Sequence, residues 1–187
     1  MEWCFYLKKM IENMNKSQIA VVPSYYQRYI EQAPDQDLLT ALQETGVAML
    51  LSERSQLVAL GDHVYAPDKW TVRAILQHII DAERIFAYRA LRLARNDKTP
   101  LPGFDEDSYA NVAPTQHRSI DDLFEELGYV RESTWIMFRQ FDETTMLRTG
   151  ICSNHEMSVV ALGFIIVGHL MHHLAVVKDR YYPLLSL

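Results

Sequence analysis

The feature that most constrains the fold is an apolar run near the C-terminus, SVVALGFIIVGHLMHHLAVVKD, from Ser158 to Asp179. Its length and its nearly uniform apolar character predict one long helix that is buried in a core. No Asp, Glu, Lys or Arg occurs from Met157 to Val177, which is long enough to span a bilayer. However, three histidines and two glycines dilute its hydrophobicity, and no other segment resembles a partner span. We therefore expect a core helix and no membrane partner.

Three histidines near the end of this run carry the first functional signal. His169 and His173 are four residues apart, so on a helix they lie one turn above the other on the same face. His172 points about 100° away from His173. Two stacked imidazoles can hold one metal ion, whereas incidental core histidines are the alternative. The pair alone leaves both interpretations open.

Apolar residues at three-and-four spacing predict three further long helices. The first spans Asp37–Leu57, the second follows Thr71 as its N-cap and stops before Asp97, and the third runs from Ser119 or Asp121 to about Phe141. We expect the third helix to bury Leu123, Leu127, Val130, Thr134, Met137 and Phe141. A short lead-in helix is predicted between Val22 and Pro34, and residues 142–157 are predicted to be irregular, with room for a short hairpin.

The expected fold class is all-α, a four-helix bundle with a long crossover connection at residues 96–119. The second helix places His78 on its core face, together with Ile75, Ala82, Ile85 and Phe86. Bundle cores hold metals with ligands from facing helices. One histidine from the second helix and two from the fourth would form such a set.

Length and composition bound the remaining possibilities. The 187 residues, 49% hydrophobic and 22% charged, suit one domain, which we place at residues 17–187 after an N-terminal extension of residues 1–16. Met14 is an alternative start. A net charge of −6 argues against a nucleic-acid partner. Two cysteines, Cys4 and Cys152, without a CxxC motif indicate a reducing, cytoplasmic setting, and the apolar run Trp3–Leu7 is too short for a secretory signal.

Competing catalytic motifs fail on inspection. No glutamate is followed three residues later by histidine, as a di-iron carboxylate bundle requires. His155 and Glu156 begin an HExxH-like string, but Val159 occupies its closing position. The sequence also lacks GxGxxG, GxxxxGK[ST] and GxSxG. Nothing marks Cys152 as a nucleophile, so we expect a structural thiol.

Three segments resemble the DinB/YfiT-like superfamily: KWTVRAILQHIIDAERIFAYRAL, LPGFDEDSY and GHLMHHLAVVKDRY. The similarity spans about Tyr25 to Tyr182. It implies an up-down-down-up four-helix bundle with a long crossover, often a homodimer, in which three histidines bind a divalent metal, commonly zinc or nickel. Carried over to this chain, the metal ligands are His78, His169 and His173.

The resemblance leaves three functions open. Characterised relatives include bacillithiol S-transferases and a mycothiol-dependent maleylpyruvate isomerase, and many others are described only as metal-dependent hydrolases. Three neutral imidazoles leave a coordination position open, where a low-molecular-weight thiol could ionise and attack a small-molecule electrophile, or a water could attack an ester or amide. A hydrolase needs a general base, for which Glu83 and Asp105 are candidates. The third possibility is a metal-binding bundle without catalysis.

Overall fold

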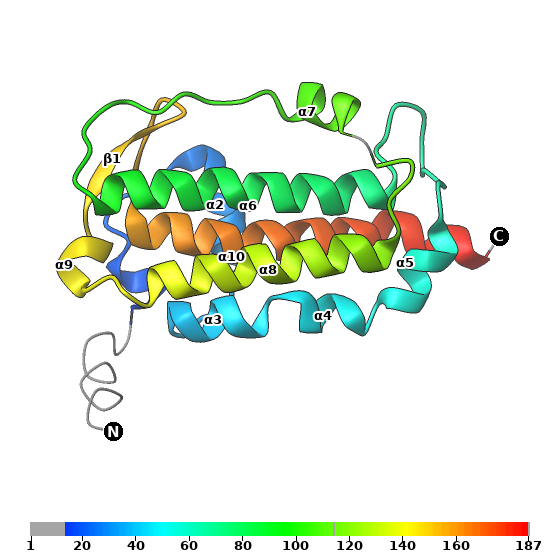
Figure 1. Ribbon diagram of the computed structural model, residues 1–187, viewed down its shortest axis with the longest axis horizontal. Helices are drawn as coiled ribbons and strands as arrows, with labels where there is room; N and C mark the ends of the chain where they lie inside the picture. Colours follow the sequence, from blue (N-terminus) through cyan, green and yellow to red (C-terminus); the bar gives the residue numbers. More distant parts are fainter. Residues whose placement is uncertain (1–13, 114, 187) are drawn as a thin grey trace.

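A computed structural model describes residues 14–113 and 115–186 of the chain, and it confirms the all-α four-helix bundle. Three long helices, α6 (Val72–Ala94), α8 (Ile120–Phe138) and α10 (Val159–Val176), lie side by side (Figure 1). A row of three shorter helices completes the bundle: α3 (Leu38–Glu44), α4 (Val47–Leu51) and α5 (Arg54–Leu60).

Smaller elements connect and cover the bundle. Before α3 lie the 3₁₀ turns η2 (Lys16–Gln18) and η3 (Ser24–Tyr26) and the short helix α2 (Gln27–Gln32), which is the predicted lead-in helix. The crossover contains α7 (Glu106–Val112). Between α8 and α10 lie α9 (Glu143–Met146) and strands β1 (Thr149–Cys152) and β2 (His155–Ser158). After α10 come the π-helical segment η4 (Val177–Tyr181) and the 3₁₀ segment η5 (Tyr182–Ser186).

The long helices begin where the sequence predicts, because side-chain oxygens satisfy their first backbone N–H groups. Thr71 Oγ1 accepts from the N–H of Ala74 at 3.2 Å, and this confirms the predicted N-cap of α6. Ser119 and Asp122 form a reciprocal capping box at the start of α8.

The prediction of one continuous helix over Asp37–Leu57 is wrong, because the chain breaks after α3 and again after α4. At the first break, the carbonyls of Leu42 and Thr45 accept from Arg131 Nη1 at 3.1 and 3.0 Å. Gly46 then leaves the helical conformation, with φ −97° and ψ −148°, as the N-cap of α4. The guanidinium of Arg131 in α8 thus donates to carbonyls that lose their helical hydrogen bonds at the break.

The buried face of α8 also differs from the predicted one. Val130 and Met137 are only partly buried, whereas Arg131 and Phe138 are buried. Arg131 points inward because its Nε and Nη2 donate hydrogen bonds to the two carboxylate oxygens of Glu83 in α6, at 2.9 Å each. A periodicity count assigns arginine to the surface. It therefore predicts Val130 and Met137 as buried, one position before the residues that are buried, Arg131 and Phe138.

The segment before α10 forms the short hairpin for which the sequence left room. β1 pairs with β2 in antiparallel register, with Cys152 opposite His155. Ser153 and Asn154 both have positive φ, 53° and 64°, as a tight two-residue hairpin turn requires. Leu101 of the crossover forms a parallel bridge to Cys152, so the hairpin anchors the start of the crossover that passes over α6 (Figure 1).

Helix α10 is the centre of the molecule. All residues from Val159 to Leu170 are buried, because α6, α2 and α3 pack around the helix. The segment Val159–Ser186 is long and apolar enough to cross a membrane, but 72% of its most apolar window is buried inside the protein. Its apolar character is thus explained by burial in the bundle.

Helix α2 crosses α10 at Gly168, directly before the first histidine of the pair. A Cβ atom at position 168 would lie 1.7 Å from the carbonyl oxygen of Tyr29. Backbone atoms cannot yield as side chains do, so only glycine permits this approach. The contact places the ring of Tyr29 against His169.

We expect Gly168→Ala to lower the free energy of unfolding by about 1–3 kcal/mol, because overpacking outweighs the helix propensity that alanine adds. Gly128→Ala in α8 is the matched control. Its Cβ would meet only Val47 Cγ2 at 3.6 Å, so this variant should match or exceed the wild-type stability. Urea denaturation measures both. Equal stability of the two variants would show that α2 does not lie at Gly168.

The predicted N-terminal extension, residues 1–16, lies mostly outside the described residues, as does Cys4, so its boundary with the domain stays a prediction. Met14 itself is 3% exposed. Its N–H donates to Asp37 at 3.2 Å, and its carbonyl accepts from the N–H of Leu38 at 2.9 Å. The chain is therefore packed onto the start of α3 from residue 14.

Candidate metal centre

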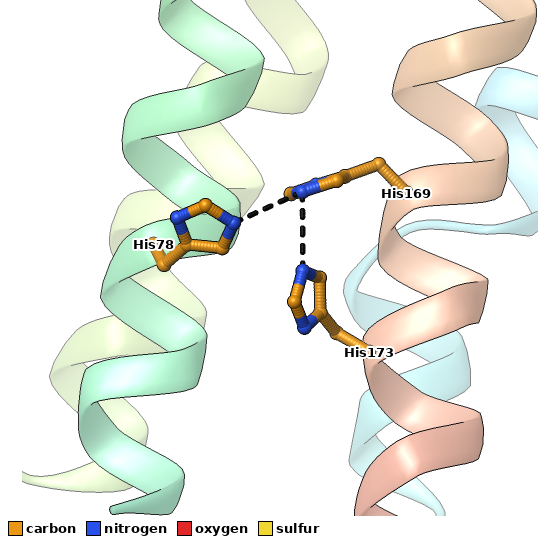
Figure 2. Close-up of side chains that lie close together, drawn as sticks. All are labelled: His78, His169 and His173. Carbon is orange, nitrogen blue, oxygen red and sulfur yellow. Dashed lines mark hydrogen bonds between the residues drawn. The ribbon is translucent and has the colours of Figure 1, made fainter. Parts of the chain in front are cut away.

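The structure brings together the three histidines that the sequence singled out. His78 comes from α6, and His169 and His173 come from consecutive turns of α10, with all three rings turned toward one another (Figure 2). Nε2 of His169 lies 3.0 Å from Nε2 of His78 and 3.1 Å from Nε2 of His173. One ligand atom from each residue falls within a 4.8 Å span.

The three nitrogens are poorly arranged for hydrogen bonds to one another but well arranged to coordinate a metal ion. A ring nitrogen carries either one proton or one lone pair in the ring plane. Nε2 of His169 therefore cannot serve both neighbours with well-directed hydrogen bonds. Three lone pairs that converge on one cation remove the conflict, and imidazole suits zinc, nickel, copper and iron. The three residues thus fit a divalent metal.

Burial keeps all three imidazoles in the neutral form that metal ligation requires. Desolvation lowers the pKa of His78 to about 4, and the charge of Asp107 opposes this shift. Desolvation, together with the neighbouring histidines, lowers the pKa of His173 to about 3. The same causes hold the pKa of His169 well below its usual value.

Comparison with known proteins identifies the family and supports the fold. The family model of the DinB superfamily matches residues 7–177. The chain belongs to the DinB superfamily. Among solved structures, YfiT from Bacillus subtilis, described as "a probable metal-dependent hydrolase with an unusual four-helix bundle topology", is similar with a TM-score of 0.61 and 14% identity. The match covers 88% of this chain and 91% of YfiT, and at this identity it shows the fold alone. No curated protein matches the chain.

In this DinB-superfamily protein, aromatic rings from α2, from α6 and from the residues just before α6 pack against two of the three histidines. The ring of Trp70, just before α6, lies 4.9 Å from that of His78. The rings of Phe86 and Tyr29 lie 5.8 and 5.2 Å from that of His169. Tyr29 stays a neutral phenol, because burial raises its pKa to about 12. The sequence gives no sign that Tyr29 joins this wall, since only the α2–α10 crossing brings it there.

His172 lies outside the triangle. Its Nδ1 is 3.3 Å from Nε2 of Gln32, and its ring packs edge to face on Tyr29, 5.3 Å away. It is partly exposed, and burial lowers its pKa to a smaller degree. The helical geometry of α10 therefore separates His172 from His169 and His173, as the spacing predicts.

Charged residues of opposite sign flank the histidines. On the α2 side, the positive charge of Arg28 contributes to lowering the pKa of His169, His172 and His173. On the α7 side, Asp107 acts on His78, and Glu106 accepts from the hydroxyl of Tyr25 at 3.3 Å. The acidic residues Glu106 and Asp107 of the crossover thus contribute to the electrostatic environment near the histidines.

The two carboxylates that we considered as general bases are engaged elsewhere. Glu83 is 2% exposed and receives the bidentate fork of Arg131. Asp105 caps α7 by accepting from the N–H of Ser108, and this hydrogen bond lowers its pKa. Cys152 is buried, which raises the pKa of its thiol. Glu83 and Asp105 are thus engaged in structural contacts, and burial disfavours the thiolate form of Cys152.

An open groove of about 630 Å³ lies elsewhere, between α6 and α8. Its lining includes Glu126, which forms ion pairs with both Arg84 and Arg118, together with Tyr129 and Met137. None of the three converging histidines lines it. The converging donors and their lowered pKa values make the histidine triangle the stronger candidate site.

Acid should destabilise the metal-free protein in a predictable window. The folded-state pKa values of His78 and His173, about 4 and 3, lie below the unfolded value of 6.5. The unfolded chain therefore takes up protons first, and the stability that is present above pH 6.5 is lost as the pH falls. Each histidine contributes a slope of up to about 1.4 kcal/mol per pH unit.

Urea denaturation of chelator-treated protein at pH 7.0 and 5.5 measures this loss. The loss should be smaller in His78→Leu, which lacks one of the titrating groups. An identical pH dependence in the wild type and the variant would contradict the assignment.

Proposed function

We propose that this protein binds a divalent metal, zinc or nickel, through His78, His169 and His173, and that it acts as a metal-dependent transferase with a low-molecular-weight thiol. The observation that carries the proposal is the convergence of three neutral imidazoles in an aromatic enclosure. When bound there, the metal supplies a Lewis acid that ionises a thiol or a water at neutral pH.

The thiol reaction is preferred because the two carboxylates that we considered as general bases are engaged in other contacts. An ionised thiol needs no general base, whereas hydrolysis requires one in most enzymes. Glu83 and Asp105 have other partners. The residues of this chain would orient and shield the reactants: the histidines hold the metal, while Trp70, Tyr29 and Phe86 exclude water from one side.

A metal-dependent hydrolase is the second candidate. Asp107, whose charge acts on His78, is the carboxylate in the described structure that favours it, because this residue could receive a proton near the metal. The description of YfiT as a metal-dependent hydrolase is in keeping with this alternative. A metal-binding bundle without catalysis is the third.

One assay separates the three. Metal-loaded protein is incubated with monochlorobimane and, in turn, glutathione, bacillithiol and coenzyme A. Conjugation, in which the thiol sulfur displaces chloride, should exceed the uncatalysed rate and disappear in His78→Ala. Ester or amide hydrolysis without a thiol, together with no conjugation, would favour the hydrolase. Full metal occupancy without either reaction would favour the binding protein.

We further propose that the protein is a cytoplasmic homodimer that takes a small-molecule substrate and no nucleic acid. The acidic net charge of −6 supports the last point. Tyr129 and Ile136 of α8, 70% and 40% exposed and two turns apart on one face, offer an apolar surface for a second copy. Light scattering after size-exclusion chromatography gives the oligomeric state, and a monomer would contradict the proposal.

A further inference from the structure

The α2 flank of the histidine triangle carries a cation, Arg28, that forms no ion pair with any acidic side chain in the described part of the chain. Arg28 is exposed, and its Nη2 donates to the hydroxyl of Tyr29 at 2.9 Å. Its guanidinium also lies over the rings of Tyr29 and Tyr25, with 4.8 and 5.6 Å between its Cζ and the ring centroids. Within the described part of the chain, no carboxylate oxygen lies within 4.0 Å of this guanidinium.

Arg28 has fewer hydrogen-bond partners than two arginines that stabilise the fold, Arg131 and Arg118. Arg131 directs its donors to Glu83 and to two backbone carbonyls, and Arg118 directs its donors to Gln77, Glu126 and the carbonyl of Asp122. Within residues 14–113 and 115–186, Arg28 donates one hydrogen bond, to the neutral phenol of Tyr29. Most of its five N–H donors are thus available to a ligand.

Two further polar groups lie along the same flank. Gln32, one turn after Arg28 on α2, has its Nε2 at 3.3 Å from Nδ1 of His172. With the amide of Gln32 as donor, Nδ1 of His172 is the acceptor, so its Nε2 carries the proton and is a donor. Arg28 and His172 therefore both offer donors on this flank, and the ring of Tyr29 contacts both residues.

This flank adjoins the metal ligands. The ring of Tyr29 packs on His169 and on His172, at 5.2 and 5.3 Å, and it supports Arg28 on its face. The close approach of α2 at Gly168 fixes this arrangement. An anionic group held by Arg28 would consequently lie next to the ring of Tyr29, which itself packs on the metal ligand His169.

We propose that Arg28, together with His172, forms a subsite for a carboxylate or phosphate group of the molecule that the metal activates. Arginine binds such groups through two parallel hydrogen bonds, which fix orientation as well as charge. The substrate class is therefore an anionic small molecule, and Arg28 is a specificity-determining residue. This inference rests on the proposed function for the identity of the molecule, but not for the binding of the anion.

Two thiols of equal length test the subsite on Co²⁺-loaded protein: 3-mercaptopropionate, which is anionic, and 3-mercapto-1-propanol, which is neutral. The sulfur-to-cobalt absorption band gives both Kd values. The anionic thiol should bind at least tenfold more tightly, and Arg28→Met, which keeps the aliphatic stem, should reduce this ratio to about one. Arg28→Lys should restore part of the ratio. The matched control is Arg139→Met, an arginine that stacks 4.7 Å over Trp135, and it should leave the ratio unchanged.

A ratio that persists in Arg28→Met would overturn the subsite, because the carboxylate would then bind the metal itself. Absence of a band with both thiols would contradict the thiol reaction instead. In that case a second readout decides the subsite: inorganic phosphate and acetate are titrated into metal-loaded protein, and the NMR signals of the His172 ring are followed. Shifts that vanish in Arg28→Met support the subsite and show which anion binds better, whereas equal shifts, or none, refute it.

Discussion

Replacement of Arg131 by methionine is expected to lower the free energy of unfolding by about 3–5 kcal/mol, the cost of leaving a buried charge without its partner. Glu83, the residue left behind, is 2% exposed and has both carboxylate oxygens within 2.9 Å of Arg131. The carbonyls of Leu42 and Thr45 would lose their donor as well. The guanidinium thus connects α6, α8 and the end of α3, and the variant removes all of these contacts.

Arg54→Met is the matched control for this experiment. Arg54 pairs with Asp121 at the start of α8 with comparable geometry, 2.6 and 2.5 Å, but the two side chains are 48% and 58% exposed. Exposed pairs contribute about 0–1 kcal/mol. Urea denaturation at pH 7 compares the variants. If Arg131→Met cost no more than Arg54→Met, Glu83 would not be confined to a structural pair, and its candidacy as a general base would reopen.

Replacement of His173 by alanine is expected to strip the metal, whereas His172→Ala should leave it near stoichiometric. His173 supplies one of the three converging nitrogens, and His172 instead contacts Gln32 and Tyr29. Loss of residues that only support a ligand costs about 10–100-fold in metal affinity, so loss of a ligand should cost more. Inductively coupled plasma mass spectrometry after dialysis measures the metal content of both variants.

The reverse pattern, with metal lost from His172→Ala and kept in His173→Ala, would mean that α10 is rotated about its axis or contains a bulge before the histidines. In the structure the π-helical segment begins only at Val177, after His173. The α-helical spacing of the pair is therefore intact, and the two single variants distinguish between the two registers directly.

The histidine cluster and the bundle could be predicted because both depend on helical periodicity. His169 and His173 are related by one helical turn, and His78 shares the core face of its helix with apolar residues. These relations hold within single helices, so the sequence reveals them without knowledge of the tertiary structure. That the three meet follows from the packing of α6 against α10.

Features that arise between elements could not be predicted in the same way. The break at Gly46 depends on a guanidinium donated from α8, more than eighty residues later in the chain. The burial of Arg131 likewise depends on Glu83 of another helix, with which it pairs. The positions of Tyr29 and Arg28 next to the histidines depend on the close approach of α2 to α10 at Gly168. Helical periodicity does not predict where two helices cross.

The measurement that tests the central claim most directly is crystallography of protein that was prepared without chelators, with diffraction data collected across the zinc and nickel absorption edges. The account predicts one anomalous peak per chain about 2.0–2.1 Å from Nε2 of His78, His169 and His173. Crystals of protein with stoichiometric metal in which the peak lies elsewhere, or in which His172 replaces one of these ligands, would contradict it.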